Sequence, residues 1–520
     1  MRRGLTRRQA LQAAAVGAAA VAVPFAPRVK QALADTLSQV PLPRPFSVPF
    51  ARPPVLRPSG TLDGRPLYVL TQRPFTANVL PGVSSTLWGY NGIFPGPTIR
   101  VSQGQPIAVR QINALPARHP QLGYQVATST HLHGHPSLPQ YDGYADDLTR
   151  PGQFKDYLYD NDTEPRTIWY HDHAAHITAE NVYMGLAAQY HILGPEEAQL
   201  PQGDYEAPLI INDAAFQANG QLLFDDQSGH GLMGDVILVN GRPWPVLKVE
   251  RRLYRFRLLN ASVSRGYLFR LSTGGPMTII RTDGGFLQRP VTVTQFKASM
   301  AERYELLIDF SAYDIGQRVV LQNLGVPNTI PFDNTDKIMA FDVVAEPRST
   351  ANNTVPPSFA AAPVMALTAA DAVATRRLDF HRDNGEWIVN QLTWAEIEAS
   401  GFRKVIASPA LNSVEVWELT NSSGGWFHPI HIHMIDFKVL TRNGKPPQPY
   451  EQGPKDVVYL GENETIRLVG RFGPHNGHYM VHCHNTVHED TDMMVQMQVG
   501  VGGPDPITAA PAQPGPPPPP

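Results

Sequence analysis

The 520-residue sequence contains a single cysteine, Cys483, so no disulfide bond can form within the chain. Charged residues make up only 17% of the chain and the formal net charge is −3, which leaves no basic excess to bind the phosphates of a nucleic acid. Beyond the N-terminus, no run of residues has the length and apolarity of a transmembrane helix, which takes about 20 residues. These absences argue against a disulfide scaffold, a nucleic-acid-binding protein and a membrane-anchored protein.

Proline and glycine are abundant instead, at 50 and 42 residues, and this favours many short strands joined by turns. Long amphipathic helices are scarce. With 42% hydrophobic residues the chain can build a sizeable core, and its length corresponds to three domains at roughly 150 residues each. The segments 254–258 and 303–310 alternate apolar with charged residues, which predicts strands with one buried and one solvated face.

Residues 1–34 have the pattern of an export signal. Arg7 and Arg8 precede an alanine- and valine-rich run, 10–23, and Ala-Leu-Ala at 32–34 fits a signal cleavage site. The pattern resembles a twin-arginine signal, the route of proteins exported already folded. A basic N-terminal helix or a retained anchor is the alternative. We therefore expect a soluble mature protein in the periplasm or outside the cell.

The remaining chain is predicted to be all-β, built from short sandwiches or Greek-key barrels. The segments 194–206 and 346–363 are low in periodicity and are interpreted as linkers. We expect the proline-rich end of the chain to be extended and mobile. The predicted organisation is a signal peptide over 1–34, domains over 35–195, 196–350 and 351–502, and a tail over 503–520.

The 18 histidines are clustered, and eight of them form four His-x-His pairs. Residues i and i+2 of a strand project to the same face, so each pair presents two imidazoles side by side. One such pair is weak support for a metal site, since exposed or hydrogen-bonded histidines are common. Two pairs fall in the first predicted domain and two in the last, which indicates duplicated domains that together could hold three metal ions. The pairs are His131 and His133, His171 and His173, His431 and His433, and His482 and His484.

Imidazole ligands alone suit copper, zinc, iron or nickel, and the lone cysteine decides among them. Cys483 lies between His482 and His484, so on a strand its thiolate points to the opposite face from theirs. His488 follows it by five residues and Met493 by ten. A further histidine, His428, lies upstream. Together these residues offer two imidazoles, one thiolate and a weak axial thioether, which is the blue-copper ligand set. A buried inert thiol is the alternative.

This arrangement predicts a short electron route. An electron that enters at the Cys483 site can pass along the adjacent backbone to a cluster held by His482 and His484. A one-electron entry site connected to a three-copper site is suited to the four-electron reduction of O2 to water.

Six motifs, found along nearly the whole mature chain, resemble those of the three-domain multicopper oxidases. They are Trp88-Gly89-Tyr90-Asn91-Gly92, Pro95-Gly96-Pro97-Thr98-Ile99, His131-Leu132-His133-Gly134, Trp169-Tyr170-His171-Asp172-His173, His428-Pro429-Ile430-His431-Ile432-His433 and His482-Cys483-His484. Within that family, the segments 167–181 and 482–494 are most similar to the branch of bilirubin oxidases and spore-coat laccases. The resemblance implies three cupredoxin-like Greek-key domains and four copper ions: one type 1, one type 2 and two type 3.

The resemblance also implies a division of the ligands, and no ligand position departs from the family pattern. The type 1 copper is assigned to His428, Cys483 and His488, with Met493 as the axial ligand. The type 2 copper is assigned to His131 and His431. The type 3 pair is assigned to His133, His171, His173, His433, His482 and His484.

Three further residues are candidates for the catalytic reaction. Asp142 and Glu489 match acidic residues that the resemblance associates with proton delivery, although a turn former and a hydrogen-bond acceptor are the respective alternatives. Trp426 lies two residues before His428, whose imidazole we expect to form the electron-entry edge, and its ring would stack on a flat donor or else fill the core.

Two groups of residues receive structural interpretations. Asp172, between two ligands, is interpreted as a hydrogen-bond partner that points away from the site. The unpaired histidines are interpreted as surface or hydrogen-bonded residues, with His135 and His176 as possible partners of ligands. They are His119, His135, His176, His191, His230, His381, His475 and His478.

The leading hypothesis is an oxidase of small phenolic, aromatic amine or tetrapyrrole donors with O2 as the partner substrate. A cuprous oxidase in copper tolerance is the first alternative, but the 12 methionines form no methionine-rich segment. A non-enzymatic envelope protein on the same fold is the second, and the complete ligand set argues against it. The length and the type 3 histidines exclude a two-domain nitrite reductase. The oligomeric state is left open.

Overall fold

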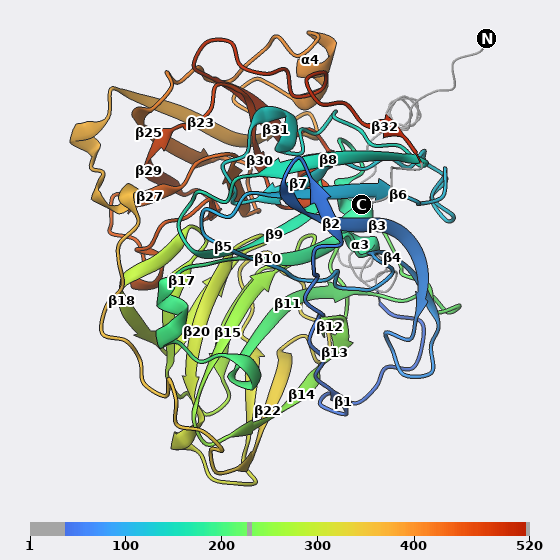
Figure 1. Cartoon of the computed structure of the whole chain (residues 1–520), viewed down its shortest axis with the longest axis vertical. Helices are drawn as coiled ribbons and strands as arrows, with labels where there is room; N and C mark the ends of the chain where they lie inside the picture. The colour runs from blue at the N-terminus through green and yellow to red at the C-terminus, as the bar shows by residue number, and fades with distance from the viewer. Residues whose placement is uncertain (1–36, 226–230, 516–520) are drawn as a thin grey trace, which may run out of the picture. The chain divides into compact units, whose positions relative to one another are not determined.

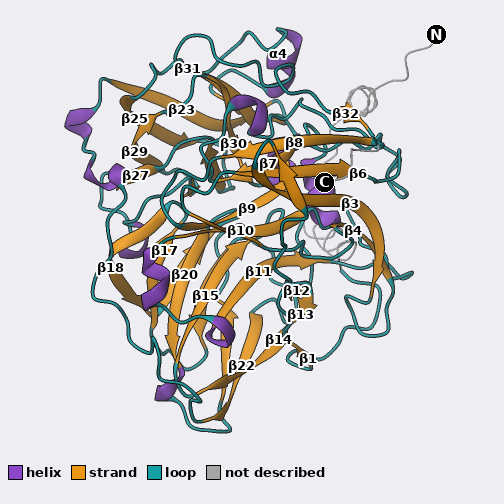
Figure 2. Ribbon diagram, viewed as in Figure 1, coloured by secondary structure: helices purple, strands orange, loops and turns teal. Residues whose placement is uncertain are grey.

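A computed structural model of the protein describes residues 37–225 and 231–515. The described residues from Ser38 onward form one compact unit. The predicted export signal and His230 lie outside the described residues. Strands and loops make up most of the described chain, and the helices are few and short (Figure 2). No helix in this part of the chain is long and apolar enough to cross a membrane.

The strands fall into three consecutive blocks of sequence, coloured from blue to red along the chain in Figure 1. The first block, residues 60–193, forms two sheets around a shared core. Its elements are β2 (Gly60–Leu62), β3 (Arg65–Ala77), β4 (Ser85–Tyr90), β5 (Ile99–Ser102), β6 (Ile107–Asn113), β7 (Thr130–His133), η1 (Pro139–Tyr141), β8 (Gln153–Tyr159), β9 (Arg166–Asp172), α3 (Thr178–Met184) and β10 (Ala187–Leu193). One sheet has the order β5-β10-β9-β7, and the other contains β2-β3-β6-β8 with β4 paired to β3.

The middle block, residues 206–345, again forms two sheets, one of which includes the early strand β1 (Val48–Pro49). Two short helices, η2 (Pro195–Gln199) and η3 (Gly203–Tyr205), precede it. Its elements are β11 (Glu206–Ala214), β12 (Val236–Val239), β13 (Arg242–Pro243), β14 (Pro245–Glu250), β15 (Leu253–Asn260), β16 (Tyr267–Leu271), β17 (Met277–Thr282), β18 (Gly285–Val293), β19 (Gln295–Ala298), β20 (Arg303–Asp309), η4 (Phe310–Ala312), β21 (Arg318–Asn323) and β22 (Lys337–Ala345). The sheet orders are β13-β12-β11-β15-β20-β17-β18 and β1-β14-β22-β21-β16-β19.

The last block, residues 374–499, follows η5 (Pro363–Ala366) and η6 (Ala369–Asp371). Its elements are β23 (Ala374–Asp383), β24 (Glu386–Val389), α4 (Trp394–Ala399), β25 (Ser413–Asn421), β26 (His428–Ile432), β27 (Phe437–Arg442), η7 (Pro449–Glu451), β28 (Val457–Leu460), β29 (Thr465–Phe472), β30 (Gly477–Cys483), α5 (Thr486–Asp490) and β31 (Met494–Val499). The sheet orders are β24-β23-β25-β29-β27 and β28-β26-β30-β31.

The three blocks repeat one strand arrangement. In the first block β3 pairs in parallel with β6, which pairs antiparallel with β8. The triads β11-β15-β20 and β23-β25-β29 have the same directions in the other two blocks. The all-β fold class of three cupredoxin-like sandwiches is therefore confirmed, whereas the domain boundaries at 195/196 and 350/351 stay predictions.

The charged faces of two strands differ from expectation. The segments 254–258 and 303–310 were predicted to have one solvated face, but β15 is buried along its whole length. Arg255 and Arg257 are fully buried because Glu305 and Glu197 pair with them, with Arg255 Nη1 at 2.6 Å from Glu197 Oε2 and Arg257 Nη1 at 2.7 Å from Glu305 Oε1. Burying charges this deeply requires such pairing. The solvated-face prediction was wrong for these residues because other parts of the fold cover that face.

Part of the predicted proline-rich tail pairs with a sheet, whereas the proline run over 516–520 lies outside the described residues. Gln513–Pro514 form a short strand, β32, which pairs antiparallel with β8 of the first block. The backbone N–H of Gly515 also donates to the carbonyl of Gly152 at 2.8 Å. Proline has no N–H to donate, so such a segment fits only at the edge of a sheet, where β32 lies.

Candidate metal centre

The first site gathers His428, Cys483 and His488 from three elements of the last block. His428 begins β26, Cys483 ends β30 and His488 lies in the short helix α5. The Nδ1 atoms of the two histidines are 3.2 Å apart, and each faces the thiol, at 3.4 Å for His428 and 3.8 Å for His488. All three side chains are fully buried. Two imidazole nitrogens and one sulfur thus converge on one point, which is the donor set that suits copper.

Met493 is tied to this site through its backbone. Its carbonyl accepts from the N–H of Cys483 at 3.1 Å, and its N–H donates to the carbonyl of His488 at 2.9 Å. Its side chain is fully buried in the core of the last block. Burial raises the pKa of the Cys483 thiol well above its usual value, so metal binding there must displace a proton.

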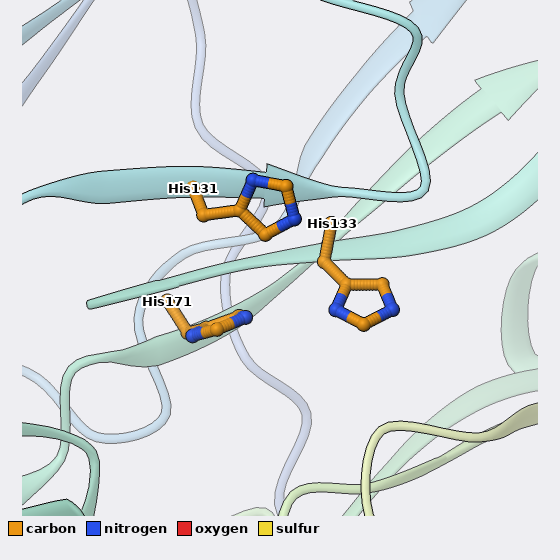
Figure 3. Close-up of side chains that lie close together, drawn as sticks. All are labelled: His131, His133 and His171. Atoms are coloured by element: carbon orange, nitrogen blue, oxygen red, sulfur yellow. The ribbon is translucent and has the colours of Figure 1, made fainter. Parts of the chain in front are cut away.

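The second site brings all four His-x-His pairs together. β7 pairs antiparallel with β9, placing His131 opposite His171, and the rings of His131, His133 and His171 lie close together (Figure 3). In the last block β26 pairs with β30, placing His431 opposite His482. The pairing geometry therefore aligns two histidine strands in each half of the site.

The two halves meet across a sequence separation of about 300 residues. His131 Nε2 lies 3.4 Å from His431 Nε2, and His173 Nε2 lies 3.2 Å from His482 Nε2. His433 Nε2 lies 3.1 Å from the same His482 atom. The eight rings are at most 1% exposed. The expectation that the two ends of the chain meet around these pairs matches this geometry.

Backbone carbonyls orient several of these rings. The Nδ1 atoms of His171 and His431 lie 2.8 Å from the carbonyl oxygens of Asp172 and Asp456, and Nδ1 of His131 contacts the carbonyl of Asp142. An N–H on Nδ1 leaves the lone pair on Nε2, which then faces the centre of the cluster.

Other ring nitrogens lack any protein partner. Among the described residues, the buried atoms Nδ1 of His133, Nε2 of His171 and both nitrogens of His484 have no hydrogen-bond partner. Leaving such groups unsatisfied costs free energy unless something binds them. Burial also lowers the pKa of these histidines, to about 3 for His171, which keeps the rings neutral and able to ligate. The residues present therefore fit a copper cluster.

The two candidate acids each contact a ligand histidine. Asp142 Oδ2 lies 2.7 Å from His433 Nδ1, and Glu489 Oε2 lies 3.0 Å from His482 Nδ1. Burial raises the pKa of Asp142. Burial would also raise the pKa of Glu489, but the neighbouring His482 and His173 lower it below its usual value.

A glycine allows the first of these contacts. Gly143 has a φ of +76°, and a Cβ there would lie 2.6 Å from the backbone of His131. Only glycine adopts this conformation at so close an approach. Gly143 therefore brings the Asp142 turn against the cluster.

The ring of His428, which we expect to form the electron-entry edge, is covered by neighbouring residues. It is fully buried, and its Nε2 lies 2.9 Å from the hydroxyl of Ser423. Half-buried Trp426 approaches His488 edge to face, with ring centroids 5.5 Å apart. Ser423 and Trp426 both belong to the loop before β26, so this loop contacts both histidines, and the roles of His428 and Trp426 in electron entry stay predictions.

Sequence reasoning missed Trp387 and Asp456. The buried ring of Trp387, on β24, stacks on His488 with centroids 4.1 Å apart. Asp456 Oδ1 lies 3.1 Å from His133 Nε2. No spacing relative to a ligand motif singles out either residue. The only sequence signal for Trp387 is the alternation of hydrophobic residues around β24. The only signal for Asp456 is the pair of adjacent charged residues, Lys455 and Asp456, before β28.

Asp172 has the structural role that we expected. Its side chain accepts from the N–H groups of Ser129 at 2.9 Å and Ala174 at 3.2 Å, and from Asn181. Among the unpaired histidines, His176 contacts Glu398 near the surface, and His135 contacts Ser137. Neither contact involves a candidate ligand.

Comparison with known proteins identifies the family. Three multicopper oxidase models match residues 73–197, 209–337 and 372–503. The chain therefore belongs to the multicopper oxidase family, as the sequence motifs indicated. It is an oxidoreductase of the laccase and bilirubin oxidase type, with copper as its cofactor and O2 as its electron acceptor.

Individual relatives cover most of the chain. The bilirubin oxidase of Albifimbria verrucaria is 39% identical over 88% of this chain and 81% of its own length. The laccase of Bacillus subtilis is 32% identical over 86% of this chain and 97% of its own. The crystal structure of a laccase from Pediococcus acidilactici superposes with a TM-score of 0.77 at 27% identity, covering 89% of this chain and 95% of the other.

Proposed function

We propose that this protein oxidises small phenolic, aromatic amine or tetrapyrrole donors one electron at a time and holds four copper ions. The observation that carries the proposal is the position of Cys483. Its thiol belongs to the first site, while the flanking His482 and His484 belong to the second, so the two sites share one strand end. Similarity to a bilirubin oxidase and to laccases supports the donor class.

The proposed ligand division is the one that the family resemblance implies, and the contacts above are compatible with it. His428, Cys483 and His488, with axial Met493, would hold the type 1 copper, and His131 and His431 the type 2 copper. The remaining six paired histidines would hold the type 3 pair. Copper, when bound, supplies one-electron transfer at the first site and O2 reduction at the second.

Protein groups supply the protons that O2 reduction consumes. Asp142 and Glu489 are buried carboxyls at the outer ring nitrogens of His433 and His482. A carboxyl in this position can hold a proton at its oxygen and pass it inward. Their pKa shifts are opposite, so Asp142 is the group that retains its proton more readily.

The donor class is tested with purified, copper-loaded protein. O2 uptake would be recorded with bilirubin, 2,6-dimethoxyphenol, an aromatic diamine and Cu(I) as donors. We expect the aromatic donors to be oxidised faster than Cu(I), since the 12 methionines form no segment that could gather Cu(I). Preferred oxidation of Cu(I) would support the cuprous oxidase alternative. A protein that holds copper but oxidises no donor would support the alternative of a non-enzymatic envelope protein.

The Met493→Leu variant is expected to stay blue and to have a raised type 1 reduction potential. The thioether is a weak axial ligand, and its loss destabilises Cu(II) relative to Cu(I). The exchange nearly conserves volume in a fully buried position, so the free energy of unfolding should fall by less than about 1.5 kcal/mol. Redox titration measures the potential, and Met494→Leu on the following residue is the matched control. An unchanged potential would show that Met493 only packs against the site.

Export remains a separate proposal that rests on Arg7, Arg8 and the run that follows. Replacing both arginines by lysine should leave the protein inside the cell, whereas the same exchange at Arg2 and Arg3 should not. Fractionation of the producing cells and N-terminal sequencing of the mature chain would measure this. Export of the Arg7→Lys, Arg8→Lys variant at the normal level would rule out the twin-arginine route.

A further inference from the structure

The middle block contributes no side chain to the groups of described residues that could hold a metal ion. One of its residues nevertheless reaches the cluster. Arg303, at the start of β20, donates from Nη1 to Asp456 Oδ1 at 2.7 Å and from Nη2 to Asp456 Oδ2. The two side chains are each 1% exposed. A bidentate pair of this kind fixes the orientation of the carboxylate as well as its position.

Asp456 in turn contacts candidate ligands from both halves of the cluster. Its Oδ1 lies 3.1 Å from Nε2 of His133, which belongs to the first block. Its backbone carbonyl lies 2.8 Å from Nδ1 of His431, which belongs to the last block. The rings of these two histidines stack on each other with centroids 3.7 Å apart. One residue therefore orients the two rings at the point where the halves of the cluster meet.

The chain is shaped locally to admit this pair. Gly134, the residue after His133, has a φ of +91°. A Cβ at this position would lie 2.7 Å from Arg303 Nη2 and 2.7 Å from Asp456 Oδ2. Any other residue would be strained by the backbone conformation and would push the arginine and the carboxylate apart.

The guanidinium group of Arg303 also donates hydrogen bonds to two backbone carbonyls. Its Nε donates to the carbonyl of Thr167 at 3.2 Å, and its Nη2 donates to the carbonyl of Asp283 at 3.2 Å. Thr167 lies on β9, four residues before His171. Arg303 therefore contacts the first, middle and last blocks at once.

We propose that Arg303 is a positioning residue of the copper cluster, which acts through Asp456 to fix the rings of His133 and His431. This inference rests on the proposed function, since it takes these histidines as copper ligands. With Nε2 of His133 engaged by Asp456, its Nδ1, which has no hydrogen-bond partner among the described residues, is the atom left to bind a metal ion. The middle block, which contributes no candidate metal ligand among the described residues, thus has a defined role in the cluster. It supplies the guanidinium group of Arg303, which holds the carboxylate of Asp456 in place.

The test measures copper affinity in the full-length protein. The Arg303→Gln variant would be loaded anaerobically with Cu(I) and titrated with a chelator, while the type 2 EPR signal is recorded after reoxidation. Losing an outer partner of a ligand typically lowers metal affinity by about 10–100-fold, and we expect a loss in this range at the cluster. Arg303→Lys should lose less, because lysine keeps the charge but not the two-pronged contact. The blue site should load normally in both variants, since His428, Cys483 and His488 do not contact this pair.

Two comparisons separate positioning from general stability. Arg442→Gln breaks a pairing with Glu451 and Glu464 in the last block, and in the part of the chain that the structure describes this pairing includes no contact with a candidate ligand. It should lower the melting temperature without changing the copper affinity. The double variant Arg303→Gln, Asp456→Asn removes both charges of the pair, so its melting temperature should exceed that of Arg303→Gln while its cluster affinity stays low.

The inference is overturned if Arg303→Gln binds cluster copper as tightly as the wild type does. It is also overturned if the double variant recovers both stability and affinity, since the pair would then be a structural ion pair only. A wild-type protein that loads no copper and develops no blue colour would instead overturn the proposed function. If Arg303→Gln does not fold, Arg303→Lys and the double variant decide between these outcomes.

Discussion

Replacing Cys483 by serine is expected to abolish the blue colour of the copper-loaded protein and its oxidation of aromatic donors. The thiolate is the strong ligand of a blue-copper set, and a hydroxyl does not replace it. No second thiol exists in the chain to substitute for it. The histidine cluster should still bind copper, because its ring nitrogens come from other side chains. Visible absorption, metal analysis and donor oxidation measure the three outcomes.

A control guards this result against a simple packing defect. Cys483 is fully buried, so serine leaves a small void and a hydroxyl in an apolar core. Val481→Ala, two residues earlier on the same strand β30, creates a void of similar origin without removing a ligand. It should stay blue. A blue Cys483→Ser protein would mean that the thiol is not the ligand at this site.

Asp142→Asn is expected to slow the reoxidation of the reduced enzyme by O2 by about 10²–10⁴-fold, the usual contribution of a positioned general acid. Asparagine can still accept a hydrogen bond from Nδ1 of His433, but it cannot hold and release the proton. Glu489→Gln should act in the same way at His482. Anaerobic reduction of the blue site by a donor should keep its wild-type rate, because the carboxylates of Asp142 and Glu489 contact histidines of the cluster: His433 for Asp142, and His482 and His173 for Glu489. Stopped-flow absorption separates the two half-reactions.

The control for this pair is a half-buried carboxylate nearby in the sequence. Asp146 accepts from the indole N–H of Trp394 at 3.0 Å and, among the described residues, contacts no candidate ligand. Asp146→Asn should leave both half-reactions unchanged. If Asp142→Asn or Glu489→Gln slows reduction while reoxidation stays fast, the proton role is wrong. Loss of copper from either variant would show that the carboxylate serves to orient its histidine.

The candidate ligands could be predicted from the sequence because the pattern that marks them is local. A His-x-His pair on a strand needs only the two-residue period to place both rings on one face, and Cys483 between two such histidines needs only the same rule. The fold class followed from turn and strand patterns for the same reason. That the histidine pairs of the first and last blocks meet was inferred from the apparent duplication of the two domains. The contact between His131 and His431 agrees with this inference.

Residues that act across the blocks could not be predicted in this way. Arg303 looked like one polar residue of an alternating strand, since alternation does not reveal that another block covers the polar face. Asp456 and Trp387 lie outside every ligand motif, and their contacts with His133 and His488 depend on tertiary packing. The buried edge of His428 has the same origin, because the loop carrying Ser423 and Trp426 folds over it.

The distance along the chain between the halves of the cluster sets an order of events during synthesis. His131 and His431 touch in the folded protein but are 300 residues apart in sequence. At 5–20 residues per second, a ribosome takes roughly 15–60 s to cover that separation. Throughout that time the four paired histidines of the first block can exist only as half of a site. Copper can therefore enter the complete cluster only after β30, which carries His482, and the following His484 have been made and β30 has paired with β26.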